Sequence, residues 1–377
     1  MARDHLSQLQ AFLDEHLPVA DNPSFVRALG EAGWVTPHWA PEHGGRGLTE
    51  AEAAEVFAAL DTQGLPRQPR GSGLVLAAPT ILHWSEEATK RRFLPPIASG
   101  AERWCQLYSE PGAGSDLASL ATTAVRDGDE WVVNGQKVWT TYGHESEMAM
   151  LLARTDPSAP KHKGITYFGM DMRAPGVEIR PLVQMTGENE FNEVFLTDVR
   201  VPDVFRISPV GEGWAATQTT LGAERTALSG TKRKKKASDE ILGGKTADEV
   251  LDLARSLGDD LTAAHRDAVV RAVIDSRVLD LTTSRRLHGS LTKIAKARTN
   301  QQLQLVAVAL LGARATAWVP DDPEIPGYIR ELLRTRANSI EGGTSEIQRN
   351  IVGERVLGLP REPDAFHGQP WSAVPRS

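Results

Sequence analysis

Hydrophobic residues recur at helical spacing through the first part of the chain. Residues 53–60 (AAEVFAAL) and 84–93 (WSEEATKRRF) carry this pattern between proline and glycine breaks. Apolar positions three and four residues apart mark one face of an amphipathic helix, and proline and glycine mark its ends. The pattern therefore predicts a helical N-terminal domain over residues 1–102.

An alternating pattern replaces the helical one between residues 103 and 207. On the last strand of this region we expect one face to carry Phe195, Thr197, Val199 and Val201, and the other Asp198 and Arg200. The pair Asn134-Gly135, set between two apolar runs, is typical of a two-residue hairpin turn. Residues 103–207 are thus predicted to form a compact antiparallel β-domain.

Helical spacing returns after the segment 211–214 (GEGW) and predicts a C-terminal bundle over residues 208–360. The residues that follow it most clearly are Leu303, Val306, Ala307, Leu310 and Leu311. A last helix is expected to begin near Ser345, in a capping box with Gln348, and to end at Gly358. Residues 361–377 are expected to be a loose tail. The fold class is therefore α+β and multidomain.

Composition narrows the possible functions. The 377 residues carry a net charge of −7, which argues against nucleic acid as a main partner. Cys105 is the only cysteine, so an intrachain disulfide and a metal site of several thiolates are both excluded, and we expect no metal. No apolar run approaches the roughly 20 residues of a spanning helix, and the N-terminus lacks a signal-like apolar region. We expect a cytoplasmic protein that binds a small molecule.

Two motifs in the predicted β-domain suggest cofactor binding. Residues 105–119 read CQLYSEPGAGSDLAS. Gly112 and Gly114 permit close backbone approach, and Ser109 and Ser115 add hydroxyl groups, a combination suited to ring carbonyls or phosphates. The second motif, WVVNGQKVWTT, follows at residues 131–141.

Together these motifs resemble the flavin-binding β-domain of the acyl-CoA dehydrogenase family. The resemblance extends over nearly the whole chain, in the order of helical domain, antiparallel β-barrel-like domain and helical bundle. Further matching segments are residues 41–48, 91–100, 191–194 and 342–349. The resemblance is closest to an actinobacterial branch whose members often act on steroid side chains or other bulky acyl-CoA esters.

The resemblance implies FAD as the cofactor. It assigns the flavin ring to Tyr108, Ser109, Gly114 and Ser115 on one side and to Trp139, Thr140 and Thr141 on the other. Thr344 and Glu346 match positions that reach FAD from the C-terminal segment, and Ser115 and Arg225 would also serve the substrate. Taken singly, Trp139 is more typical of a core residue, and the two threonines are typical of strands, but the joint pattern favours flavin.

The family removes an α-proton from an acyl-CoA thioester with a carboxylate while the β-hydrogen leaves as hydride to flavin N5. Its branches place that carboxylate at one of two positions. The segment LGAER at 221–225 puts Glu224 at the first, and Glu341 lies one residue from the second, which Gly342 occupies. A one-residue offset in a helix rotates a side chain by about 100°. We therefore expect Glu224 to be the base, with Glu341 as the alternative.

The chain also departs from the family pattern. Typical members have an Arg-x-x-Phe-Gly stretch and a Gly-Gly-x-Gly turn that hold FAD across a subunit contact, and both are missing here. Two alternatives to a dehydrogenase stay open. The missing motifs favour a non-catalytic partner subunit, and a flavin oxidase or monooxygenase stays open because oxygen access depends on the packing around the flavin. The resemblance implies a homo-oligomer or a heterotetramer, with electron-transfer flavoprotein or a similar acceptor. The basic run 232–236 either attracts coenzyme A phosphates or is a solvated loop.

Overall fold

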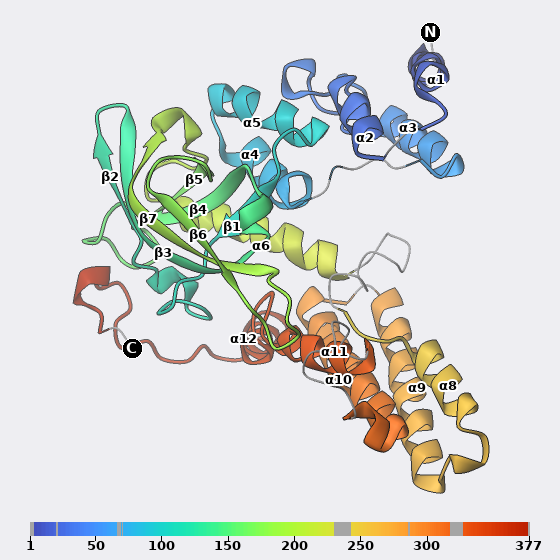
Figure 1. Cartoon of the computed structure of the whole chain (residues 1–377). Coiled ribbons are helices and arrows are strands. Elements are labelled where there is room, and N and C mark those ends of the chain that lie inside the picture. The colour runs from blue at the N-terminus through green and yellow to red at the C-terminus, as the bar shows by residue number, and fades with distance from the viewer. Residues whose placement is uncertain are drawn as a thin grey trace. The chain divides into compact units, whose positions relative to one another are not determined.

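The computed structural model describes residues 4–19, 22–65, 69, 71–229, 243–285, 287–316 and 327–375. The side chains of residues 224–229 are not described. The basic run 232–236 lies outside the described residues. The chain divides into two compact units (Figure 1). The first unit comprises Met1–Leu182, Glu190–Thr220 and Phe366–Ser377, and the second comprises Val183–Asn189 and Leu221–Ala365.

Helices form the N-terminal part of the first unit, as predicted. They are α1 (Asp4–His16), α2 (Asn22–Glu31), α3 (Glu50–Thr62), α4 (Ala78–Trp84) and α5 (Glu87–Ser99). A capping box between Thr49 and Glu52 starts α3, which contains the predicted segment 53–60. The predicted segment 84–93 is divided, because α4 ends at Trp84 and α5 begins at Glu87. Apolar side chains of α1, α2 and α3 form one buried cluster together with Trp34 and Val35, which follow α2.

Within the described residues, seven strands form one curled sheet (Figure 1). They are β1 (Trp104–Leu107), β2 (Thr123–Asp127), β3 (Glu130–Thr141), β4 (Met148–Arg154), β5 (Ile165–Asp171), β6 (Val177–Leu182) and β7 (Phe191–Pro202). The order is β1-β4-β2-β3-β7-β6, and β5 pairs with β4 outside this path. Four of the six described strand pairs are antiparallel, whereas β4 runs parallel to both β1 and β2, which departs from the predicted antiparallel domain. The predicted helical, β and helical order is confirmed.

The hairpin predicted at Asn134-Gly135 is wrong. Strand β3 continues through both residues, and the turn lies between Asp127 and Glu130, where Gly128 has a φ of +62°. Gly135 is required for a different reason, since a Cβ there would lie 2.3 Å from Oγ1 of Thr122. A β-bulge against β7 occurs at the same place.

The predicted faces of β7 are also wrong in part. Val199 and Val201 are buried and Arg200 is exposed, as expected, but Phe195 is only half-buried and Thr197 is exposed. The buried residues of this half of the strand are instead Val194 and Leu196. Asp198 has a φ of +51°, and Asn134 bonds both its backbone N–H and its carboxylate. This irregularity shifts the alternation by one residue.

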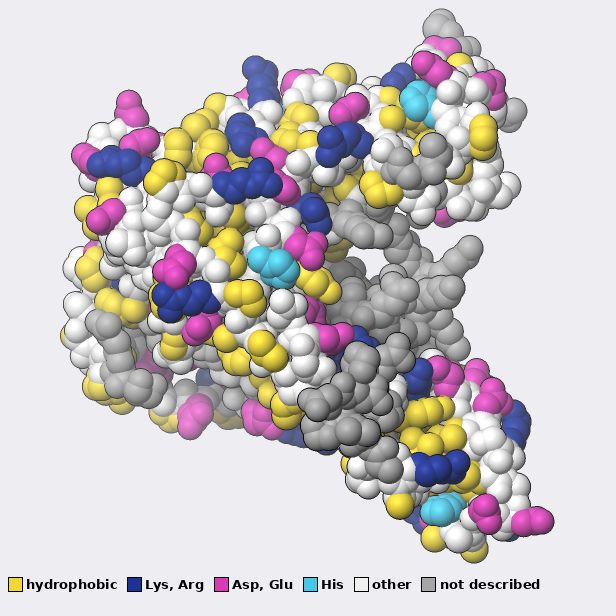
Figure 2. Space-filling model, viewed as in Figure 1, with side chains coloured by type: hydrophobic (Ala, Val, Ile, Leu, Met, Phe, Trp, Pro, Cys, Tyr) yellow, Lys and Arg dark blue, Asp and Glu magenta, His cyan; other side chains and the backbone are white. Residues whose placement is uncertain are grey.

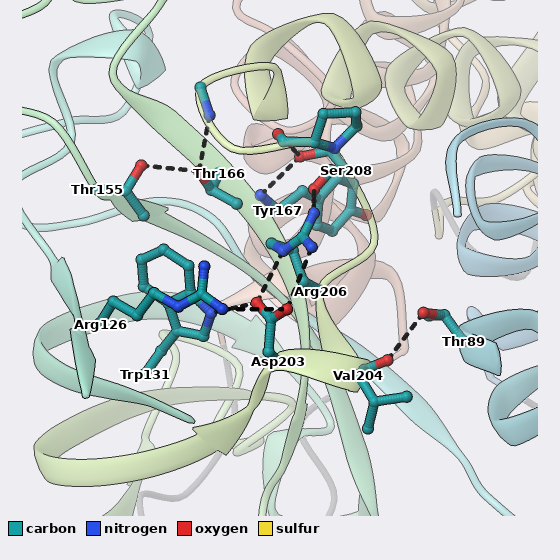
Figure 3. Close-up of polar contacts among 12 residues, drawn as sticks. Thr89, Arg126, Trp131, Thr155, Thr166, Tyr167, Asp203, Val204, Arg206 and Ser208 are labelled. Carbon is teal, nitrogen blue, oxygen red and sulfur yellow. Dashed lines mark hydrogen bonds and ion pairs between the residues drawn. The ribbon is translucent and has the colours of Figure 1, made fainter. Parts of the chain in front are cut away.

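The segment that follows β7 is fastened to the sheet before helix α6 (Gly213–Ser229) begins. The carboxylate of Asp203 accepts hydrogen bonds from Nε1 of Trp131 at 2.7 Å and from Nε of Arg206 at 2.9 Å (Figure 3). The backbone N–H of Tyr167 donates to Oγ of Ser208, and that of Gly211 donates to a threonine of β5. These contacts fix the point at which α6 leaves the sheet.

The second unit is helical. Its longer helices are α8 (Ala247–Ser256), α9 (Ala263–Ser284), α10 (Gly289–Leu311), α11 (Gly327–Arg334) and α12 (Ser345–Ile351). The predicted apolar face of α10 packs in the core of this unit, where Leu303, Val306, Ala307 and Leu310 are buried. The capping residue of α12 is Thr344, one residue before the prediction, because the side chain of Gln348 bonds the carbonyl of Gly342 instead.

The predicted loose tail is wrong at its distal end. The side chain of Trp371 is buried, and its backbone N–H donates to the carbonyl of Ala159 at 2.9 Å. The next residue, Ser372, donates to the carbonyl of Pro157 at 3.0 Å. The tail therefore docks on the β-domain of the first unit. Among the described residues, the structure has no helix that combines the length and apolar character needed to cross a membrane.

Candidate active site

The loop after β1 is folded around the carboxylate of Glu110. One oxygen of this carboxylate accepts from the backbone N–H of Ala121 at 2.6 Å, and the other accepts from that of Thr122 at 2.9 Å. The backbone of Glu110 also exchanges two hydrogen bonds with Ala113. The carboxylate thus joins the two ends of the loop 110–122, and the serine- and glycine-containing stretch lies between them.

A buried lysine of β3 completes this arrangement. Nζ of Lys137 donates to Glu110 at 2.8 Å and to the carbonyls of Tyr108 and Leu152 at 3.1 and 2.8 Å. Burial alone would raise the pKa of Glu110, but the charge of Lys137 and the hydrogen bonds to the carboxylate outweigh it and hold the pKa below its usual value. Burial lowers the pKa of Lys137, and the charge of Glu110 opposes this shift. The two groups form a buried ion pair.

The tip of the loop presents unused hydrogen-bond donors. Gly112, Gly114 and Ser115 are exposed, and a Cβ added at either glycine would meet no atom within 4 Å. Within the described part of the chain, the backbone N–H groups of Gly114 and Ser115 donate to no other group. A set of amide and hydroxyl donors at the tip suits a ligand with carbonyl or phosphate oxygens.

Trp139 is held in a strained and exposed position at the end of β3. Its φ is +62°, its side chain is 61% exposed, and its ring meets Phe191 edge-on. Tyr142 follows with a φ of +49°. Each such non-glycine residue costs about 1–3 kcal/mol, which proteins retain mainly at functional sites. The bulge between Lys137 and Thr140 turns Trp139 out of the sheet.

The two threonines beside Trp139 differ. Thr140 is buried, and its Oγ1 has no hydrogen-bond partner among the described residues. Thr141 is exposed. The structure brings this segment next to the loop, because the N–H of Val138 donates to the carbonyl of Ser109 at 2.9 Å. The two sequence motifs therefore form one surface region.

A chain of buried hydroxyl groups runs from this region toward α6. The hydroxyl of Tyr108 lies 2.6 Å from that of Tyr167, which lies 3.2 Å from Oγ1 of Thr220 on α6. Thr220 in turn lies 2.7 Å from the hydroxyl of Thr80 on α4. Burial raises the pKa of Tyr167, so its hydroxyl stays protonated and available as a donor.

The two candidate bases differ in their surroundings. Glu224 lies on α6, four residues after Thr220, and its side chain and that of Arg225 are not among the described ones. The carboxylate of Glu341 accepts two hydrogen bonds from Arg334, both at 3.2 Å, and one from Asn338 at 2.9 Å. Both oxygens of Glu341 are therefore engaged in an ion pair within the second unit.

The two C-terminal candidates lie around the start of α12. Oγ1 of Thr344 accepts from the backbone N–H of Ile347 at 3.2 Å, as a helix cap. The glycine turn before it is fixed by Lys293, whose Nζ donates to the carbonyl of Gly343 at 2.6 Å. Glu346 is exposed and pairs with Arg349. Glu224, Arg225, Glu341, Thr344 and Glu346 belong to the second unit, and their placement at the site stays a prediction.

Sequence reasoning missed the residues that support the loop, namely Glu110, Lys137 and Tyr167. One signal was available for Lys137. It lies an even number of residues from the buried Trp131 and Val133, so an alternating pattern puts it on the same face of the strand. A lysine at such a position is buried against an apolar core and requires an anionic partner. The sequence does not indicate which carboxylate that partner is.

Comparison with protein families matches the chain in three segments. Residues 2–101 match "Acyl-CoA dehydrogenase, N-terminal domain", residues 105–199 match the middle domain, and residues 261–357 match the C-terminal domain. Acyl-CoA dehydrogenase IpdE1 of Mycobacterium tuberculosis is 37% identical over 357 residues, which cover 92% of this chain and 90% of that protein. The IpdE1 protein of Mycolicibacterium smegmatis is 33% identical, with coverage of 92% and 91%.

Solved structures agree with these matches. The Tcur3481-Tcur3483 steroid ACAD superposes with a TM-score of 0.72 at 29% identity, covering 94% of this chain and 97% of that one. The ChsE4-ChsE5 complex of Mycobacterium tuberculosis gives 0.69 at 28% identity, with coverage of 94% and 96%. The fold and the matches define a flavoprotein oxidoreductase that acts on acyl-CoA. The chain belongs to the acyl-CoA dehydrogenase family, and its mycobacterial relatives confirm the resemblance to the actinobacterial branch.

Proposed function

We propose that this chain is an FAD-dependent dehydrogenase that introduces an α,β-double bond into an acyl-CoA thioester. The observation that carries the proposal is the region formed by the loop 108–115 and Trp139. It combines unused amide donors with an exposed indole held at a positive φ. Backbone strain beside a rigidly supported, donor-rich loop is typical of a binding site.

The residues present fit a flavin. An isoalloxazine ring has a polar edge of carbonyl oxygens and ring nitrogens and a flat apolar face. The amides of Gly114 and Ser115 and the hydroxyls of Ser109 and Ser115 suit the polar edge, and the indole of Trp139 suits the flat face. Bound FAD would supply the two-electron acceptor for the β-hydrogen of the substrate.

We assign the removal of the substrate α-proton to Glu224. The two hydrogen bonds from Arg334 to Glu341 favour Glu224, because they occupy both oxygens of the Glu341 carboxylate within the second unit. Glu224 would take the α-proton, and Arg225 and Ser115 would orient the thioester. The hydroxyl chain from Tyr108 reaches α6 at Thr220, four residues before Glu224 in the sequence.

We also propose that the chain acts as an oligomer, either with itself or with a related subunit, and passes electrons to electron-transfer flavoprotein or a similar acceptor. Helix α9 carries a stripe of exposed apolar residues: Val270, Ile274, Val278 and Leu281. Their spacing of four, four and three residues puts them on one face. Hydrophobic side chains also lie on the surface over the helices of this unit (Figure 2). Such a stripe is typical of a subunit contact.

The base assignment is tested with Glu224→Gln, and Glu341→Gln serves as the matched control. Each purified variant is first checked for bound flavin by its visible absorption, then mixed anaerobically with acyl-CoA esters. Esters with steroid-derived acyl groups are tried first, because one of the similar solved structures is a steroid ACAD. Glu224→Gln should slow flavin reduction by about 100- to 10,000-fold, and Glu341→Gln should reduce flavin normally. The reverse result would assign the base to Glu341. Wild-type protein that takes up no FAD would favour the partner-subunit alternative.

A further inference from the structure

The end of the chain is built into the β-domain beside the cofactor loop. Residues 361–370 are exposed, yet Trp371 is only 7% exposed. Pro370 bridges to Pro160, and the backbone N–H groups of Trp371 and Ser372 donate to the carbonyls of Ala159 and Pro157. The contact is therefore anchored by backbone hydrogen bonds as well as by the buried indole.

The indole of Trp371 covers a buried arginine. The guanidinium of Arg154, which is 2% exposed, lies 4.1 Å from the centre of the indole ring. Arg154 donates to the carbonyl of Ala118 at 2.7 Å and to that of Leu120 at 3.0 Å. Nε1 of Trp371 faces the carbonyl of Ser119 at 3.4 Å. Trp371 and Arg154 together contact three consecutive residues of the loop.

Residues 118–120 immediately precede the two residues whose backbone N–H groups hold the carboxylate of Glu110. Ala121 and Thr122 follow them and donate their N–H groups to Glu110, which pairs with Lys137. A cation–π contact strengthens when the cation is removed from water, as it is at Arg154. Loss of the indole would admit water to the guanidinium and weaken its hold on residues 118–120.

We propose that the C-terminal tail is a clamp on the flavin-binding loop, and that Trp371 is a positioning residue that acts on the loop through Arg154. The effect of the clamp on FAD binding rests on the proposed function, whereas its effect on the order of the loop does not. The clamp assigns a role to a segment that follows the last helix and lies beyond the matched C-terminal domain.

The test compares full-length Trp371→Ala with Trp371→Phe, which keeps an aromatic ring over Arg154. Phe366→Ala is the matched control, because it truncates another aromatic residue of the same tail. Hydrogen exchange is measured on each protein without flavin, and FAD affinity is then measured by quenching of flavin fluorescence. The hydrogen-exchange measurement tests the clamp even if the wild-type chain takes up no FAD. A failure to take up FAD would count against the proposed function and not against the clamp.

Trp371→Ala should speed exchange at Ala121 and Thr122 by about tenfold, leave the core strands β4 and β5 unchanged, and weaken FAD binding by about tenfold. Trp371→Phe should retain most of the wild-type behaviour, and Phe366→Ala all of it. The clamp is overturned if Ser372 exchanges faster while Ala121 and Thr122 do not, because the tail would then have left without effect. A uniform increase across β4 and β5 would also overturn it, since that result indicates general destabilisation.

Discussion

Replacing Lys137 with methionine tests the buried ion pair under the cofactor loop. The substitution keeps an unbranched side chain of similar length and removes the ammonium group. It also removes the donor to Glu110 and to the carbonyls of Tyr108 and Leu152. The carboxylate then stays buried, with only the N–H groups of Ala121 and Thr122 as partners.

The expected cost is large because one charge loses its partner. Breaking a buried ion pair by removing one member typically costs about 3–5 kcal/mol of the free energy of unfolding. The two remaining amide bonds to Glu110 reduce the cost, and the carbonyls of Tyr108 and Leu152 that lose a donor add to it. We therefore expect Lys137→Met to lose about 3–5 kcal/mol near neutral pH.

The difference in stability between Lys137→Met and the wild type should also change with pH, in a direction set by the pKa of Glu110. In the wild type the pKa of Glu110 lies below its unfolded value, so its stabilising contribution is present above the unfolded pKa and is lost as pH falls through the folded pKa. Without the ammonium, burial dominates and the pKa of Glu110 rises above the unfolded value. The variant should then recover stability relative to the wild type between about pH 7 and about pH 5.

Denaturant unfolding at both pH values measures this difference, with tryptophan fluorescence as the signal. The double variant Lys137→Met with Glu110→Gln is the matched control, because it lacks both titrating groups of the pair and should show a constant deficit over the same range. A deficit for Lys137→Met that stays constant or grows as the pH falls would refute the account. Such a result would mean that Glu110 is not held ionised by Lys137.

Two further predictions follow from other parts of the fold. Tyr167→Phe removes the hydroxyl between Tyr108 and Thr220 and should destabilise the protein by about 1–3 kcal/mol in denaturant unfolding; an unchanged midpoint would show that the hydroxyl chain contributes nothing. The double variant Ile274→Glu with Val278→Glu should lower the molar mass in light scattering, whereas Val125→Glu, at an even more exposed valine of β2, should not. Equal masses for all three proteins would exclude the α9 stripe as the subunit contact.

Periodicity predicted the elements well and their irregularities poorly. Helix α10 and strand β7 were both recognised, because their apolar residues repeat at the expected spacing. The shift of β7 at Asp198 could not be predicted, since it depends on Asn134 of a different strand. Asn134-Gly135 gave a misleading hairpin signal for the same reason, because its role is to accommodate Thr122 and Asp198.

The candidate site was predicted from its motifs, and its support was not. The exposed loop residues and Trp139 have sequence signals, because glycine, serine and an isolated tryptophan are informative in their own motifs. The partners of Lys137 and Arg154 are mostly carbonyl groups, which any residue supplies, so no residue type marks them. Trp371 was overlooked because one aromatic residue in a proline-containing tail has no periodicity.

The most direct test of the central claim is an anaerobic titration of the purified wild-type chain with acyl-CoA esters while the visible absorption band of the flavin is recorded. Our account predicts a yellow protein whose band is bleached by at least one ester, since bleaching requires bound flavin, a working base and dehydrogenase chemistry together. A yellow protein that reduces with none of the esters, including the steroid-derived ones, would contradict the assignment as a dehydrogenase. A protein that binds no FAD would contradict the proposed flavin site itself.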